Sequence, residues 1–420
     1  MKKNYLQHFN PKIIKMIKEI GQEADRTNQS AYVVGGCVRD IFLKRENLDL
    51  DIVVEGDAGS IARRWRHKYS APLKEYDRFG TATVYLNGDI RIDFARARQE
   101  TYPYPAALPV VRPGSIQEDL FRRDFTINAM AIRINDKNFG ELVDVYHGLE
   151  DLKKGKIRVL HTKSFIDDPT RILRAVRFEQ RFHFRLESLT SKLLTEAMQK
   201  NALSAVKPER YFAEFKKVLG EEHPGRCLKR LGQIGALRHD QFYFNIRPAY
   251  VQKIVRGIGS IKRKPYFSEA MDRWLIYFMS LMAPESQPAV EKLCTLFNLK
   301  RSDRQKILPN GVWQSLLTQL KGSQMRPSQI YHILKPLSLE TIIFMRLISP
   351  QRNVHQNIDR FLTRYNQVGL TMNGNDLKRL GLVDGKRIGE VLKYLLDQKV
   401  DGKIKTKSDE RVAARRFIGQ

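Results

Sequence analysis

Two aspartates, Asp49 and Asp51, stand two positions apart in the segment 48–54, whose other residues are leucine, isoleucine and valine. The segment predicts a β-strand, and on a strand two such residues project from the same face. Carboxylates this close repel each other unless a cation lies between them. Because Mg²⁺ commonly bridges protein carboxylates and substrate phosphates, we predict that Asp49 and Asp51 are catalytic and bind Mg²⁺.

Asp93 is a third acidic candidate, in the alternating segment 90–94 that predicts a neighbouring strand. Three acids around one or two metal ions suit an in-line phosphoryl or nucleotidyl displacement. The sequence therefore makes Asp93 a catalytic candidate and leaves open whether it is a metal ligand or a general base.

Two glycines, Gly35 and Gly36, follow the short apolar run 31–34 and precede the segment 37–44, whose apolar spacing predicts a helix. Glycine lets the backbone approach a ligand closely, and a helix N-terminus offers unpaired N–H groups to phosphate. Arg39, in the first turn, would add a charge-assisted contact. These three residues are predicted to bind a nucleotide.

The elements that must position these residues change along the chain. Segments 81–86 and 90–94 flank Asn87-Gly88, a hairpin signal, and segment 101–114 with its four prolines predicts a long loop. After about residue 150 the apolar spacing becomes helical, as in 168–182, 189–199 and 208–219. We predict an α+β fold: a head with a small mixed or antiparallel sheet, followed by an all-α neck, body and tail.

Three arginines, Arg171, Arg174 and Arg177, recur at every third position of the predicted helix 168–182. They share one side of this helix, while Ile172 and Val176 lie on the other. Like charges at this spacing destabilise a helix, so an anion bound along the stripe would relieve the strain.

These motifs, in this order, resemble the nucleotidyltransferase superfamily, in the branch of class II tRNA nucleotidyltransferases and bacterial poly(A) polymerases. The resemblance covers roughly residues 30–220. It is carried by residues 35–40, 49–51, 122–131 and 167–178.

The resemblance implies further site residues. Arg122, Arg123 and Asp124 match the motif that recognises the ribose. Asp168 and Arg171 match the pair that reads the incoming base, with Asp167 where the family has glutamate. A carboxylate only accepts and a guanidinium only donates, so the pair would match cytosine and adenine, but not guanine or uracil. Arg174 and Arg177 would hold the triphosphate or surround the base.

Charge is distributed unevenly over the 420 residues. The formal net charge is +28, of which residues 1–150 carry +2 and residues 151–420 carry +26. A surplus of this size attracts nucleic acid. The longest apolar run is far too short to cross a membrane, and three scattered cysteines build no disulfide framework, so we expect a cytoplasmic protein.

We therefore predict three parts: a nucleotidyltransferase head (1–150), a helical neck that recognises the base (151–220) and a basic body and tail that bind tRNA (221–420). The expected activity is addition of CCA, or only the terminal A, to tRNA from CTP and ATP. The alternatives are a poly(A) polymerase, which shares the head, and an inactive RNA-binding module. The sequence leaves the oligomeric state open.

Overall fold

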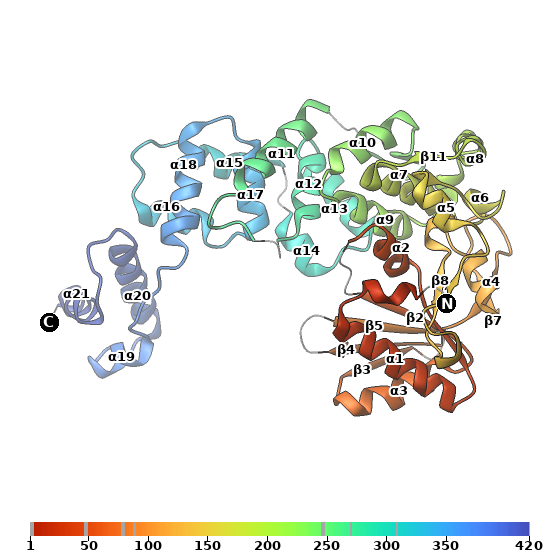
Figure 1. Cartoon of the computed structure of the whole chain (residues 1–420). Helices are drawn as coiled ribbons and strands as arrows, with labels where there is room; N and C mark the ends of the chain where they lie inside the picture. The colour runs from red at the N-terminus through yellow and green to blue at the C-terminus, as the bar shows by residue number, and fades with distance from the viewer. Residues whose placement is uncertain are drawn as a thin grey trace. The chain divides into compact units, whose positions relative to one another are not determined.

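The computed structural model describes residues 4–45, 49–76, 80–86, 90–244, 248–268, 271–307 and 310–419. The chain divides into two compact units (Figure 1). The first comprises Met1–Glu214 and Arg230–Gln241, and the second Phe215–Lys229 and Phe242–Gln420.

The first unit is built on a seven-stranded sheet in the order β3-β4-β5-β2-β1-β8-β9. Neighbouring strands are antiparallel except β2 and β5, which are parallel. The mixed sheet confirms the predicted fold class. The predicted Asn87-Gly88 turn lies outside the described residues, but β4 and β5 on either side of it pair antiparallel. The strands are β1 Ser30–Val34, β2 Asp49–Glu55, β3 Leu73–Tyr76, β4 Thr81–Leu86, β5 Ile90–Arg96, β8 Ala131–Arg133 and β9 Leu142–Val143.

Helices α1 (Pro11–Arg26) and α3 (Ala58–Tyr69) cover one face of this sheet (Figure 1). Trp65 of α3 lies against Phe94 of β5, with ring centroids 6.3 Å apart. Because strand residues alternate, the residue next to Phe94, Asp93, projects to the opposite face.

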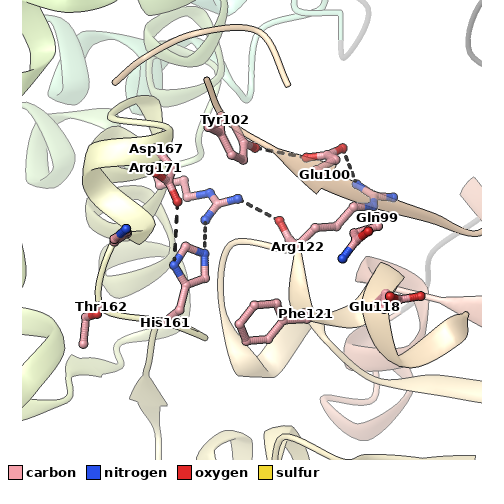
Figure 2. A pocket seen from close by; sticks show the side chains of 11 residues that line it. Gln99, Glu100, Tyr102, Glu118, Phe121, Arg122, His161, Thr162, Asp167 and Arg171 are labelled. Atoms are coloured by element: carbon pink, nitrogen blue, oxygen red, sulfur yellow. Dashed lines mark hydrogen bonds and ion pairs between the residues drawn. The ribbon is translucent and has the colours of Figure 1, made fainter. Parts of the chain in front are cut away.

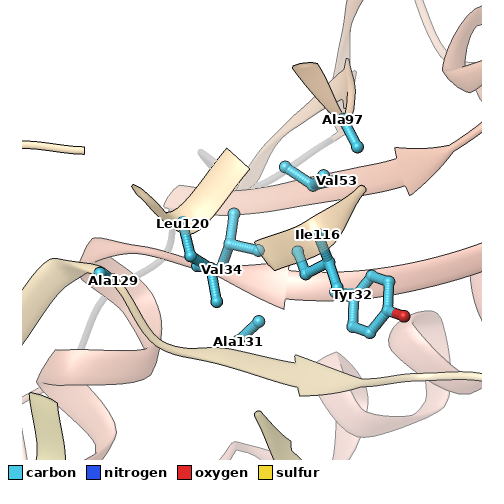
Figure 3. Packing of buried hydrophobic residues seen from close by; sticks show 8 residues of the cluster. All are labelled: Tyr32, Val34, Val53, Ala97, Ile116, Leu120, Ala129 and Ala131. Atoms are coloured by element: carbon cyan, nitrogen blue, oxygen red, sulfur yellow. The ribbon is translucent and has the colours of Figure 1, made fainter. Parts of the chain in front are cut away.

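The opposite face is covered in part by α4 (Ile116–Phe121). Ile116 and Leu120 of this helix pack on Val34 and Val53 of the sheet, and Tyr32 completes the cluster with three alanines (Figure 3). The cluster covers this face of β2 at Val53. The N-terminal end of β2, which carries Asp49 and Asp51, is not part of the cluster.

The segment 101–114 was predicted to be a long loop, and this is wrong. Strands β6 (Arg98–Thr101) and β7 (Val110–Pro113) pair antiparallel and enclose a shorter connection. Three of the four prolines fall between the two strands, where no backbone N–H is needed for pairing, and Pro113 ends β7.

Helices form most of the remaining first unit. The elements there are α2 Gly36–Phe42, α5 Gly148–Lys153, β10 Lys156–Ile157, α6 Ser164–Asp167, α7 Thr170–Phe182, β11 Arg185–Leu186 and α8 Ser188–Gln199. Short 3₁₀ helices span Tyr5–His8, Thr126–Asn128, Asp136–Asn138 and Ala202–Ala205. Helix α9 (Pro208–Leu219) begins in the first unit, and helix α10 (Pro224–Gln233) ends in it. Of the two-residue strands that follow, β12 (Arg238–His239) belongs to the first unit and β13 (Phe242–Tyr243) to the second.

The second unit is helical, as predicted. At its C-terminal end, Leu377, Val391, Leu395 and Ala414 form a separate apolar core. Among the residues that the structure describes, no helix has both the length and the apolar character of a membrane span. The helices are α11 Pro248–Ile261, α12 Arg273–Met282, α13 Gln287–Leu296, α14 Arg301–Lys306, α15 Asn310–Gln319, α16 Pro327–Leu334, α17 Leu339–Ile348, α18 Arg352–Arg360, the π-helix Phe361–Tyr365, α19 Gly374–Arg379, α20 Gly385–Val400 and α21 Lys407–Ile418.

Candidate active site

The three candidate acids lie on the face of the sheet opposite α1 and α3. The parallel register of β2 and β5 places Asp51 directly opposite Asp93, and Asp49 opposite Arg91. Burial, together with the neighbouring charges of Asp93 and Asp49, raises the pKa of Asp51 to about 6, although Arg123 opposes the shift. The carboxylates therefore repel one another, which is the electrostatic condition expected of a cation site.

Asp93 also has partners of its own. It accepts a hydrogen bond of 2.5 Å from Thr83 Oγ1 and forms a 2.6 Å ion pair with Arg91, while Asp49 is exposed. Within the described part of the chain, no three His, Cys, Asp or Glu side chains are grouped as a metal site. Two carboxylates that share a cation with substrate oxygens fit this arrangement, and Mg²⁺ is commonly bound in this way.

The turn between β1 and α2 requires glycine at position 35. Gly35 has a φ of +75°, and a Cβ there would lie 2.7 Å from Arg123 Nη1 and 3.8 Å from Asp51 Oδ2. The absent side chain lets the Arg123 guanidinium and the Asp51 carboxylate approach the backbone. Gly36 opens α2 beside them.

A cavity of about 450 Å³ lies beside this turn, entirely within the first unit. Its lining contains seven arginines and four carboxylates, so it suits an anionic ligand. Asp49 and Asp93 do not line it but lie next to Asp51 on the same face of the sheet. The cavity brings together the other predicted site residues: Gly35, Gly36, Arg39, Asp51, Arg122, Arg123, Asp124, Asp168, Arg171, Arg174 and Arg177.

Arg122 and Arg123 are both held by Asp119 of α4, a fully buried carboxylate. Asp119 Oδ1 accepts from Arg122 at 2.7 and 2.9 Å, and Oδ2 accepts from Arg123 at 2.9 Å. Although burial raises the pKa of Asp119, the two arginines lower it below the ordinary value. Arg122 also reaches Glu100 of β6 at 3.2 Å, so the β6–β7 hairpin is linked to the cavity.

Asp124 is engaged through both of its oxygens. Oδ2 forms a two-pronged contact with Arg174 at 2.5 and 2.8 Å, and Oδ1 accepts from Asn128 at 2.9 Å. Burial raises the pKa of Asp124, but Arg174 and Asn128 lower it more, to about 2. Arg174 also contacts Glu214 of α9 at 3.4 Å.

The candidate base-reading residues lie at the start of α7. Asp168 Oδ1 accepts from Thr170 Oγ1 at 2.7 Å and from Arg210 at 3.2 Å. Arg171 is only 4% exposed and donates to Ser164 Oγ and to the Arg122 carbonyl oxygen, each at 2.7 Å. Both residues line the large cavity, and Arg171 also lines an adjoining cavity of about 310 Å³ (Figure 2).

Arg39 and Arg177 also line the cavity, but both are buried. Arg39 donates to Asp40 at 2.8 and 2.9 Å and to Asn128 at 2.5 Å. Arg177 lies over the ring of Phe178, 4.6 Å from its centroid. Protein contacts therefore fix these side chains, and the arginine stripe of α7 is not a solvated surface.

Sequence reasoning did not assign several residues that hold the site together. Asp119, Ser164 and Arg210 contact predicted site residues, yet none of them stands out by local spacing. Glu100, which carries the link to Arg122, was not assigned either. Knowledge of which helices pack together was needed to find the others.

Known proteins match this chain over most of its length. Residues 31–158 match the family model of the poly(A) polymerase head domain. Residues 183–239 match a model described as a probable RNA- and SrmB-binding site of polymerase A.

Individual proteins match as well. An A-adding tRNA nucleotidyltransferase of Halalkalibacterium halodurans is 31% identical, over 96% of this chain and 92% of its own length. One of Geobacter sulfurreducens is also 31% identical, over 97% of this chain, but the chain spans only about half (48%) of that relative. A solved CCA-adding enzyme in complex with ATP is 33% identical, with a TM-score of 0.69 and 99% of each chain covered.

The head-domain match over residues 31–158 spans the sheet and the cavity residues from Gly35 to Asn128. The similarity to the individual proteins extends further, through α7 and the helical second unit. The chain therefore belongs to the family of tRNA nucleotidyltransferases that carry a poly(A) polymerase head domain.

Proposed function

We propose that this protein is a metal-dependent RNA nucleotidyltransferase that adds the terminal A, or the complete CCA sequence, to the 3′ end of tRNA. ATP, and CTP for the cytidines, would be the nucleotide substrates and pyrophosphate the second product. One observation carries the proposal: a single cavity is lined by Asp51, by arginines suited to a triphosphate, and by the Asp168–Arg171 pair. The names of the relatives support tRNA as the acceptor and A as an added nucleotide.

In this proposal Asp49 and Asp51 hold Mg²⁺, which would stabilise the charge that develops on the reacting phosphate. Gly35 and Gly36 let the triphosphate approach the start of α2, where Arg123 lies. Arg174 and Arg177 contribute positive charge along α7, and Asp124 with Arg122 faces the ribose. Asp93 lies opposite Asp51 on the neighbouring strand and is either a second metal ligand or the base for the attacking 3′-hydroxyl.

The base would be selected by hydrogen-bond direction. Asp168 can only accept, and Arg171 can only donate. Adenine and cytosine each present an amino donor beside a ring-nitrogen acceptor, whereas guanine and uracil present the reverse pattern. A wrong base would leave buried groups unpaired, which costs orders of magnitude in rate.

The test uses tRNA ending before CCA, after the first C, and after CC, each incubated with both ATP and CTP, one of which is labelled. Addition of one A only to the CC-ended tRNA identifies an A-adding enzyme, and completion of all three substrates a CCA-adding enzyme. A long A tail identifies a poly(A) polymerase. The absence of any incorporation would contradict the proposal and favour an inactive RNA-binding module.

The division into a catalytic head (1–150), a base-reading neck (151–220) and a basic tRNA-binding body and tail (221–420) is part of the proposal. The +26 net charge of residues 151–420 supports the assignment of RNA binding to the helical region. The cytoplasmic location stays a prediction from the sequence.

A further inference from the structure

Ser164 contacts both members of the base-reading pair. It begins the short helix α6 and is completely buried. Its carbonyl oxygen accepts the Asp168 backbone N–H at 3.2 Å, and its hydroxyl oxygen accepts from Arg171 Nη1 at 2.7 Å.

The opposite terminal nitrogen of Arg171 is held separately. Arg171 Nη2 donates to the Arg122 carbonyl oxygen at 2.7 Å, and His161 Nε2 lies 3.5 Å from Nη1 (Figure 2). A guanidinium is planar, and its five N–H donors point in fixed directions. Because each terminal nitrogen makes one 2.7 Å hydrogen bond, to Ser164 Oγ or to the Arg122 carbonyl oxygen, the plane of the guanidinium is fixed. The direction of its remaining donors is then fixed as well.

We infer that Ser164 is a positioning residue for base selection, acting through Arg171. The inference rests on the proposed function and deepens it. The Arg122 contact comes from the backbone and cannot be removed by mutation, so the Ser164 hydroxyl is the short side-chain contact that sets the guanidinium plane. Without it Arg171 keeps its charge and still lines the cavity, but it can turn about the Arg122 contact. Discrimination against guanine and uracil then weakens, whereas the affinity for the triphosphate changes less.

The test compares Ser164→Ala with the wild type, using kcat/KM for addition of ATP and of GTP to tRNA ending in CC. We expect the ATP-to-GTP ratio to fall by about 10-fold or more. Ser164→Thr retains the hydroxyl and should keep the ratio near the wild-type value. Thr195→Ala removes an exposed hydroxyl of α8 that lines neither cavity, and it should leave the ratio unchanged. If Ser164→Ala does not fold, Ser164→Cys keeps a similar volume with a much weaker acceptor.

A purely structural role predicts a lower melting temperature and equal losses of kcat/KM for ATP and GTP. An unchanged ratio in an active Ser164→Ala or Ser164→Cys enzyme therefore overturns the inference and leaves the proposed function intact. A wild-type protein that incorporates no nucleotide into any of the three tRNAs overturns the proposed function, and with it the role of Ser164.

Discussion

Buried carboxylates fix the arginines that line the cavity. Asp119 holds Arg122 and Arg123, and Asp124 holds Arg174, all at hydrogen-bonding distance. A buried carboxylate that accepts from guanidinium groups is strongly stabilised in its charged form. The arginines are therefore placed before a nucleotide binds, and less conformational entropy is lost on binding.

Asp51 gives the first prediction at the scale of single residues. Asp51→Asn removes one proposed metal ligand, so nucleotide incorporation should fall by about 100-fold or more. The same change removes the repulsion from Asp49 and Asp93, so the melting temperature should rise. Calorimetry and primer extension measure the two effects, and Asp136→Asn, at an exposed site, should change neither. Full activity of Asp51→Asn would exclude the metal assignment.

Asp124 gives a second prediction, on the pH dependence of stability. Its pKa is about 2 in the folded protein and 3.8 in a free aspartate. As the pH falls, Asp124 is therefore protonated in the unfolded chain before it is protonated in the folded protein. Above about pH 5 its charged form contributes about 2 kcal/mol to the free energy of unfolding, and this contribution is lost as the pH falls toward 2.

Urea denaturation of wild type and Asp124→Asn at a series of pH values tests this prediction. The wild type should be more stable above pH 5, and the difference in unfolding free energy should shrink by about 2 kcal/mol toward pH 2. A difference that stays constant over this range would contradict it.

At the scale of elements, the β1–α2 turn decides how closely Arg123 and Asp51 approach the backbone. Gly35→Ala puts a Cβ at a positive φ and 2.7 Å from Arg123, so we expect a loss of about 1–3 kcal/mol in unfolding free energy and lower activity. Gly36→Ala is the matched control, because its Cβ meets only Arg39, at an ordinary 3.6 Å. Equal stability of the two variants would show that the turn is not constrained as described.

The hairpin of β6 and β7 and the start of α9 brace the same cavity from outside the sheet. Glu100 of β6 reaches Arg122, and Arg210 of α9 binds both Asp168 and the Ala106 carbonyl oxygen. These contacts connect the hairpin to the residues that would read the base, so the segment that was expected to be an open loop is part of the site's framework.

At the scale of the whole molecule, the excess positive charge predicts how RNA binding responds to salt. Each phosphate that a lysine or arginine neutralises releases counterions, so the affinity for tRNA should fall by about 100-fold or more between 50 and 200 mM salt. Titrations of labelled tRNA at several salt concentrations measure this. ATP makes far fewer phosphate contacts, so its affinity should fall less, and an affinity for tRNA that is independent of salt would exclude an electrostatic RNA surface.

The sequence by itself determined the directions of side chains within each element. The two-residue period of β2 places Asp49 and Asp51 on one face, and the helical period of α7 groups Arg171, Arg174 and Arg177. Both are local properties of the backbone, which a few consecutive residues encode. The head-and-helices architecture and the order of the motifs were predictable for the same reason.

Only the tertiary structure decided which of these faces meet. The parallel register that sets Asp51 opposite Asp93 joins strands separated by a helix and two further strands. Arg174 donates to Asp124, which lies 50 residues away in the sequence, and Arg171 donates to the Arg122 carbonyl oxygen, 49 residues away. Such contacts depend on how whole elements pack, and the spacing of residues within one helix or strand does not indicate them. For this reason Asp119, Ser164 and Arg210 emerged only once the chain was folded.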